Sequence, residues 1–244
     1  MFRTLNLKPL AILFVCAFSA PTLLFGQSDE QPATNWRVRR AQVESEWIDD
    51  LKQLGTWCEE NGLQEQMQET YQWYLHRDPE RTYIFLPGEE GFAPAGEGIT
   101  GQWQSQMDEL RRQHAARILE LARQAAAEDA GTDAFRFLNE VLYYDPDHEA
   151  VREMLGHRKT DEGWRVASDR IRSKVENRKK QVLMDWPAGS WVSVNSPHFN
   201  ISSQAGEEAT IELARKLERW HGVWRQMFFE FWSRPANVRR WIEG

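Results

Sequence analysis

The stretch AARILELARQAAAEDAGTDAFRFLNEVLYYDPDHEA, residues 115 to 150, decides the fold of this chain. Counted from Ala115, apolar or small residues occupy positions 4, 7, 8, 11, 20, 24 and 27, and a proline occupies position 32. These residues are Ile118, Leu121, Ala122, Ala125, Ala134, Leu138 and Val141, followed by Pro146. Their spacing predicts two amphipathic helices that cross where the residues are small.

The same pattern occurs once more upstream, in the same register. Counted from Ile48, it is made of Leu51, Leu54, Gly55, Cys58, Met67, Tyr71, Tyr74 and Pro79. A 34-residue unit with these positions resembles the tetratricopeptide repeat, a helical hairpin that stacks on its neighbours and binds partners on the resulting surface. Residues 148–156 begin a third such helix, because Leu155 and Gly156 fall at positions 7 and 8. The sequence therefore predicts a mainly α protein.

The first 26 residues have the features of a secretion signal. Arg3 and Lys8 are basic, residues 10–25 carry no charge, and Gly26 is a small residue suited to cleavage. The uncharged stretch has 16 residues, fewer than the roughly 20 that a membrane-spanning helix requires. We expect export to the periplasm or the exterior; an uncleaved segment that tethers the chain to a membrane is the alternative. Polar residues 27–35 are expected to form a linker.

Charge and cysteine content narrow the possible functions. The formal charge is −7, and it becomes −9 when residues 1–26, with their two basic residues and no acid, are removed. An acidic chain without a recognisable nucleic-acid-binding motif is not expected to bind DNA or RNA. Cleavage also removes Cys16, so Cys58 cannot form an internal disulfide, and its repeat position predicts a buried, unreactive side chain.

The helical region is expected to span residues 36–165, with one interruption. Glycines and prolines crowd residues 86–101, so we expect an inserted loop over 82–101. A long helix is predicted over 102–124. Residues 166–186 are rich in charge with few apolar positions, and we expect a solvated connecting helix there.

Residues 187–244 follow a different period. Trp191, Val192 and Val194 alternate like a strand, as do Phe199 and Ile201. A helix is expected to open at Gly206 with two glutamates in its first turn. Its wide apolar stripe consists of Leu213, Leu217, Trp220, Trp224, Met227, Phe228 and Phe231. We expect two strands and one amphipathic helix, the opening part of an α+β domain whose remainder is missing.

Several passages resemble a known group of proteins. They are the NGL and DPDHEA turns of the repeats, the passage from Leu155 to Trp164, and SPHFNISSQAGEEATIELARKLERW, residues 196 to 220. They resemble secreted bacterial proteins of unknown function in which tetratricopeptide-like helices precede a zinc metallopeptidase-like domain. The resemblance covers residues 36–244 loosely.

The catalytic motif that this resemblance implies is missing from the sequence. A zinc peptidase of this kind uses His-Glu-x-x-His, which places two imidazoles on one helix face. The nearest string runs from His148 to Arg152, and it predicts a helix start rather than a set of ligands. His198, expected in a strand, and His221, expected on a helix, have no partner at metal spacing in the sequence. We therefore expect no catalytic residues, no cofactor and no metal.

Two functions remain open at this stage. The first is an exported protein-interaction or scaffold protein without catalysis of its own, which holds a protein or peptide on the face lined by Lys52, Trp57, Arg117 and Gln124. The second is a truncated or degenerate relative of a secreted zinc metallopeptidase. The oligomeric state does not follow from the sequence.

Overall fold

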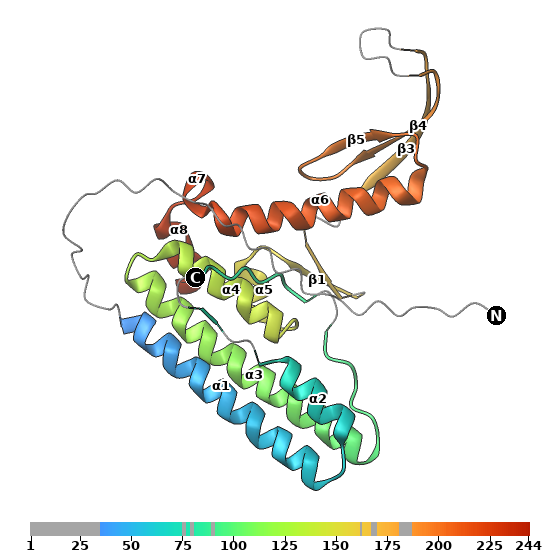
Figure 1. Ribbon diagram of the computed structural model, residues 1–244. Helices are drawn as coiled ribbons and strands as arrows, with labels where there is room; N and C mark the ends of the chain where they lie inside the picture. The colour runs from blue at the N-terminus through green and yellow to red at the C-terminus, as the bar shows by residue number, and fades with distance from the viewer. Residues whose placement is uncertain are drawn as a thin grey trace, which may run out of the picture. The chain divides into compact units, whose positions relative to one another are not determined.

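The computed structural model describes residues 35–74, 77–78, 81–88, 91–161, 163–166, 170–180 and 187–244. The expected signal segment, nearly all of the expected linker, and Pro79 lie outside these residues. The helices are α1 (Asn35–Glu60), α2 (Gln64–Gln72), α3 (Gly98–Ala127), α4 (Gly131–Tyr144), α5 (Glu149–Met154), α6 (Glu207–Met227), α7 (Phe229–Trp232) and α8 (Pro235–Glu243). The strands are β1 (Arg158–Thr160), β2 (Gly163–Arg165), β3 (Arg172–Arg178), β4 (Gly189–Asn195) and β5 (Asn200–Ser203). The chain is mainly helical with a small α+β segment, as the sequence predicts (Figure 1).

The helices α1 to α4 form two helical hairpins with the same turn. After α1, Gly62 has a φ of 70°, and the amide of Leu63 donates to the carbonyl of Cys58 at 2.9 Å. After α3, Asp129 takes the corresponding position with a φ of 59°, and Ala130 donates to Ala125 at 2.8 Å. Each turn ends its helix with a residue in the left-handed conformation. The turn also supplies a backbone amide to a carbonyl in the last turn of the helix that has no partner within the helix.

The second hairpin buries its repeat positions completely. The seven residues that define it all have an exposed fraction of 0%: Ile118, Leu121, Ala122, Ala125, Ala134, Leu138 and Val141. The first hairpin follows the pattern less fully: α2 ends at Gln72, before Tyr74, and both Tyr71 and Tyr74 are 44% exposed. Gly55 nevertheless meets the expectation of a small residue at the crossing, since a Cβ there would lie 2.4 Å from the hydroxyl of Tyr71. Cys58 is buried, also as expected.

A buried ionic cluster joins the two hairpins. Glu140 of α4 is 3% exposed and accepts two hydrogen bonds from Arg40 of α1, at 2.8 and 2.9 Å. Arg77 donates to the same carboxylate, and Oε1 of Glu44 lies 2.6 Å from Arg40 and 2.9 Å from Arg77. Burial, together with the neighbouring Glu140, raises the pKa of Glu44 to about 8.

The expected connecting helix over residues 166–186 is wrong. Residues 172–178 instead form β3, which pairs with β4 along its whole length, from Arg172 opposite Asn195 to Arg178 opposite Gly189. The sheet therefore has three antiparallel strands in the order β3-β4-β5 rather than the two expected. Residues 158–160 and 163–165 add a short hairpin of β1 and β2 that does not follow from the sequence pattern. The inserted loop is also shorter than expected, because α3 already begins at Gly98.

Helix α6 connects this sheet to the helical hairpins. Its first half packs on the sheet (Figure 1). Ala214 there forms a small core cluster with the buried residues Val192 and Val194. At its other end, Gln226 is buried and donates to the carbonyl of Phe85 at 2.7 Å, and Phe229 packs into the main core. Residues 33–244 accordingly form one compact unit. None of the described helices combines the length and the apolar character needed to cross a membrane.

Helix α8 covers the turn of the second hairpin, where α3 ends and α4 begins. Arg239 donates to the carbonyl of Ala126, at the C-terminal end of α3, from Nε at 3.1 Å and from a terminal nitrogen at 3.0 Å. A cation in this position satisfies the last carbonyls of a helix and stabilises its negative end. Gly131 at the start of α4 lies so close to Pro235 that a Cβ would come within 2.4 Å of the Cα of that proline.

Candidate functional site

The four residues expected to bind a partner lie on α1 and α3, and most of them already have intramolecular contacts. Arg117 forms ion pairs with Asp50 at 2.7 Å and Glu46 at 3.4 Å, and so holds α3 against α1. Trp57 packs against the core, whereas Lys52 is exposed and Gln124 is partly buried. The structure gives no contact that joins the four residues into one site, and their role in binding stays a prediction.

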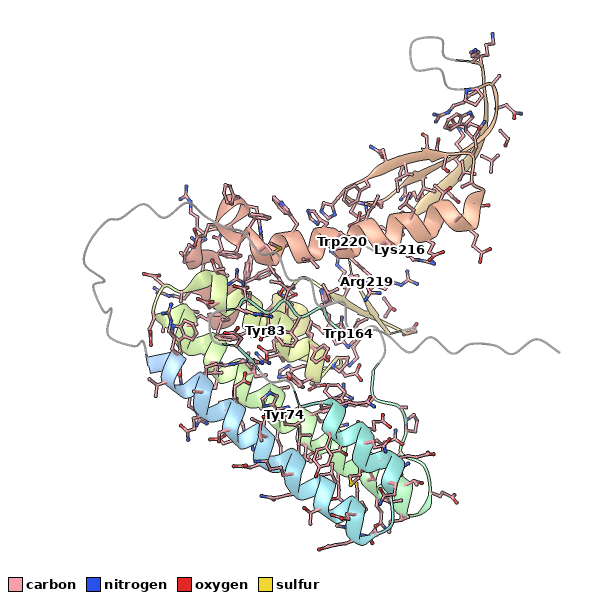
Figure 2. All side chains as sticks on the ribbon, in the orientation of Figure 1. Tyr74, Tyr83, Trp164, Lys216, Arg219 and Trp220 are labelled. Carbon is pink, nitrogen blue, oxygen red and sulfur yellow. The ribbon has the colours of Figure 1, made fainter. Side chains whose placement is uncertain are left out.

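The apolar stripe of α6 remains exposed in the structure. We use the name apolar face for Leu213, Leu217, Trp220, Trp224, Met227, Phe228 and Phe231. Six of these seven side chains are at least 40% exposed, and Phe231 reaches 83%. Trp220, labelled in Figure 2, lies on α6 within one turn of Lys216 and Arg219. Large contiguous apolar surfaces are uncommon on monomeric proteins and mark sites of interaction.

Three aromatic residues of the apolar face belong to a row of neighbouring rings that begins with two histidines. The ring of His221 stacks on that of His198 with centroids 3.7 Å apart, and on that of Trp224 with centroids 5.8 Å apart. Phe228 follows Trp224 at 5.8 Å, and Phe231 follows Phe228 at 5.9 Å. The two histidines therefore lie at one end of this row of rings, beside the apolar face.

At that end, three side chains form what we call the histidine cluster: His198, Glu218 and His221. Glu218 and His221 are three residues apart on α6 and so lie on the same side of the helix. His198 lies in the turn between β4 and β5, not within a strand as expected. Within this turn the amide of Ser196 donates to the carbonyl of Phe199 at 2.9 Å, which closes the turn that carries His198.

Glu218 holds the turn to the helix through two hydrogen bonds. Its Oε1 accepts from the backbone amide of His198 at 3.0 Å, and its Oε2 lies 2.7 Å from Nδ1 of the same residue. Burial alone would raise the pKa of Glu218, but hydrogen bonds from Ser196 and His198 outweigh it and hold the pKa below its ordinary value. Burial, followed by the neighbouring His198, lowers the pKa of His221. At neutral pH the cluster thus combines a carboxylate with a neutral His221.

One ligand atom from each member of the histidine cluster lies within 4.8 Å of the others. In the part of the chain that the structure describes, these three form the one such group that could hold a metal ion. The expectation that His198 and His221 have no partner at metal spacing is therefore wrong. Glu218, which no sequence motif marks as a ligand, supplies the third donor. A shallow pocket adjoins the cluster and is lined by Phe199, Trp220, His221 and Trp224.

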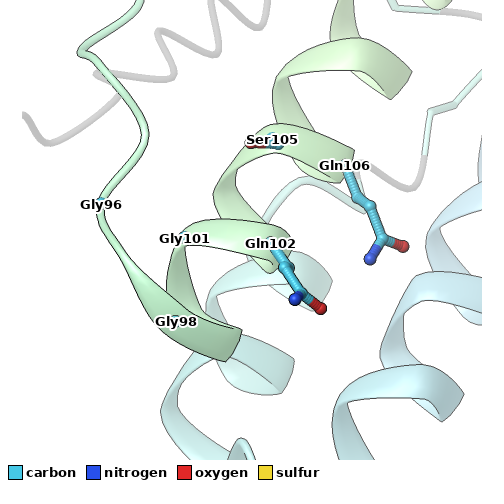
Figure 3. Close-up of a pocket in the computed structure, with 6 residues that line it drawn as sticks. All are labelled: Gly96, Gly98, Gly101, Gln102, Ser105 and Gln106. Atoms are coloured by element: carbon cyan, nitrogen blue, oxygen red, sulfur yellow. The ribbon is translucent and has the colours of Figure 1, made fainter.

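A second hollow lies at the start of α3 (Figure 3). Its lining consists of Gly96, Gly98, Gly101, Gln102, Ser105 and Gln106. Gly101 is needed there because a Cβ would lie 1.7 Å from the carbonyl oxygen of Gly96. The lining contains amides and a hydroxyl but no side chain that titrates near neutral pH, so it lacks the groups for acid-base chemistry.

The string from His148 to Arg152 starts a helix, as predicted. His148 precedes α5, and Arg152 is buried, where its Nε donates to the carbonyl of Pro146 at 2.7 Å. The Arg152 side chain also donates to the carbonyl of Gly88 at 3.1 Å and so ties α5 to the inserted loop. Arg152 therefore has a structural role, although it occupies the position that the second histidine would have in a His-Glu-x-x-His motif.

Comparison with known proteins identifies no relative: no family model, curated protein or solved structure matches this chain. The resemblance to proteins with a zinc metallopeptidase-like domain therefore stays a prediction.

Proposed function

We propose that this chain is an exported protein-interaction module, without catalysis of its own, that binds a partner through the apolar face of α6 and α7. The observation that supports this most strongly is the exposure of Trp224, Phe228 and Phe231 next to one another. Aromatic side chains are the residues that most often carry the binding energy of protein interfaces.

The spacing of the apolar face favours a helix as the partner. Leu213, Leu217, Trp220, Trp224 and Met227 follow one another at intervals of four, three, four and three residues. This alternation has the mean period of 3.5 residues that two packed helices share along their seam. The seam extends over 14 residue steps of α6, roughly 21 Å at 1.5 Å per residue. A partner helix with its own apolar seam would cover it.

A pair of double variants tests the proposal. Trp224→Ser with Phe231→Ser removes two exposed anchors, and Lys52→Ala with Gln124→Ala serves as the matched control on α1 and α3. Each tagged chain is recovered from the producing cell, its partners are quantified by mass spectrometry, and binding is then measured with the purified partner. Truncation of an anchor residue costs about 2 kcal/mol or more, so affinity should fall by about 30-fold or more in the first variant only.

Three results would contradict the proposal. One is retention of the same partners by the Trp224 and Phe231 variant with unchanged affinity. Another is loss of partners in the Lys52 and Gln124 variant alone, which would place the contact on α1 and α3. The third is binding of the purified chain to phosphatidylglycerol vesicles through the same aromatic residues with no protein partner, which would make the apolar face a lipid contact.

A further inference from the structure

We propose that His198, Glu218 and His221 bind a divalent transition-metal ion, with zinc as the best match. This goes beyond the proposed protein contact, because neither the apolar face nor the helical hairpins require a metal. Two imidazole nitrogens and one carboxylate oxygen are donors that zinc accepts, and sets of two histidines and one glutamate occur with a fourth position open.

The distances allow such a site after small side-chain rotations. Ligand atoms bound to one tetrahedral zinc ion at about 2.0 to 2.1 Å lie roughly 3.3 Å from one another. The three donors here are within 4.8 Å of one another, and Nδ1 of His198 and Oε2 of Glu218 are 2.7 Å apart. An ion at this place would replace the hydrogen bond between these two atoms. The side chain of His198 is 40% exposed, so its ring has room to turn toward an ion.

The backbone already holds the three donors in position. Glu218 is buried on α6, and its Oε1 is fixed by the amide of His198, which orients the carboxylate toward the imidazole. His221 follows on the next turn of the same helix and stacks against His198. An arrangement of ligands on rigid elements, with a hydrogen bond that orients the carboxylate, raises metal affinity because less order must be created on binding.

The surroundings give the open coordination position access to solvent and to a ligand. His221 lines the pocket formed with Phe199, Trp220 and Trp224. Three protein ligands leave the fourth position of a tetrahedral ion for water or for a donor from another molecule. The metal site would therefore lie at the edge of the proposed contact surface.

Metal binding is tested on the full chain alone, after the metal has been removed with a chelator. Zinc is titrated calorimetrically, and cobalt is titrated in parallel because its visible absorption reports coordination by nitrogen and oxygen. We expect one ion per chain. His198→Ala and His221→Ala should each weaken binding by at least about 100-fold, since even the loss of a group that only orients a ligand costs about 10- to 100-fold.

Two further variants make the result decisive. Glu218→Gln keeps the shape of the side chain and should weaken binding as much as the histidine variants; if it unfolds by circular dichroism, the two exposed or half-buried histidines decide the question. His148→Ala is the control, a histidine outside the cluster, and should bind zinc with unchanged affinity. No binding by the wild-type chain would overturn the proposal. The proposal would also be overturned if the His198→Ala and His221→Ala variants bound zinc with the same affinity as the wild-type chain. Partner binding is measured separately, so failure of either proposal leaves the other to its own test.

Discussion

One buried histidine, His114 of α3, should make the free energy of unfolding change measurably with pH. Its side chain is 1% exposed, and neither ring nitrogen has a hydrogen-bond partner among the described residues. The ring stacks on Trp47 with centroids 4.5 Å apart and meets the edge of Tyr144 at 4.4 Å. Burial, reinforced by the positive charges of Arg77 and Arg117, lowers the pKa of His114 to about 3.

The sign and size of the effect follow from this pKa. The unfolded chain binds a proton on His114 near pH 6.5, whereas the folded chain does so only near pH 3. Protonation therefore favours the unfolded state, and the free energy of unfolding falls as the pH drops from about 6.5 toward 3. At 1.36 kcal/mol per pH unit, the loss between pH 7 and pH 5 is about 2 kcal/mol from this residue alone.

The variant His114→Phe isolates this contribution. It keeps an aromatic ring against Trp47 and Tyr144 but cannot bind a proton. The free energy of unfolding of both proteins is measured by urea denaturation at pH 7 and pH 5, and the difference between the two proteins is compared. Wild type should lose about 2 kcal/mol more than the variant over this range, equivalent to roughly 4 to 8 °C in melting temperature. Parallel pH dependence of the two proteins would refute the argument, whatever their stabilities at pH 7.

Four other substitutions have definite expected results. Gly131→Ala should lower the free energy of unfolding by about 1 to 3 kcal/mol, because a Cβ would clash with the backbone of Pro235. Gly222 lies inside α6, and a Cβ there would come no closer than 3.8 Å to the Leu86 side chain, so Gly222→Ala should raise the free energy of unfolding by about 0.5 to 1 kcal/mol. Urea denaturation of the Gly131 and Gly222 variants measures both effects. Glu140→Gln should cost about 3 to 5 kcal/mol in the same assay, because it leaves Arg40 and Arg77, both partly buried, without their main carboxylate. Because the folded state raises the pKa of Glu44 to about 8, the free energy of unfolding of the wild type should fall as the pH rises from 4.5 to 8. Glu44→Gln should remove this part of the pH dependence. Thermal melts in which the melting temperature of the variant and of the wild type changes equally with pH would contradict it.

The helical hairpins could be predicted because their signal is redundant. In the second copy, seven positions obey one pattern, and each of them is fully buried. The first copy shows the limit of this reasoning, since α2 ends at Gln72 although Tyr74 fits the pattern. Periodicity reports which positions face a core, but it does not report where a helix ends.

Strand β3 could not be recognised because its sequence fits two periods. Ile171 and Val175 are four residues apart, a spacing compatible with a helix face and equally with one face of a strand. The charged residues between them suit a solvated helix, but they also suit an edge strand, where charges prevent association with other chains. Pairing with β4 decides between the two, and pairing is a property of the fold that the local sequence does not contain.

The histidine cluster was missed for a related reason. His198 lies 20 residues before Glu218, and only the packing of α6 on the sheet brings the two together. A partial signal was present, since Glu218 and His221 are one helical turn apart. The pattern His-Glu-x-x-His does not cover a glutamate followed by a histidine three residues later. Spacing within one helix identifies two donors, and the third comes from another element of the fold.

The apolar face can be tested most directly by photo-crosslinking in the producing cell. A photoreactive amino acid is placed at Trp224 or at Phe231, and in parallel at Lys52 or at Gln124, and the adducts are mapped by mass spectrometry. We expect adducts from Trp224 and Phe231 to one apolar helix of a partner, and none from the other two positions. Adducts from Lys52 or Gln124 alone, or from no position, would contradict it.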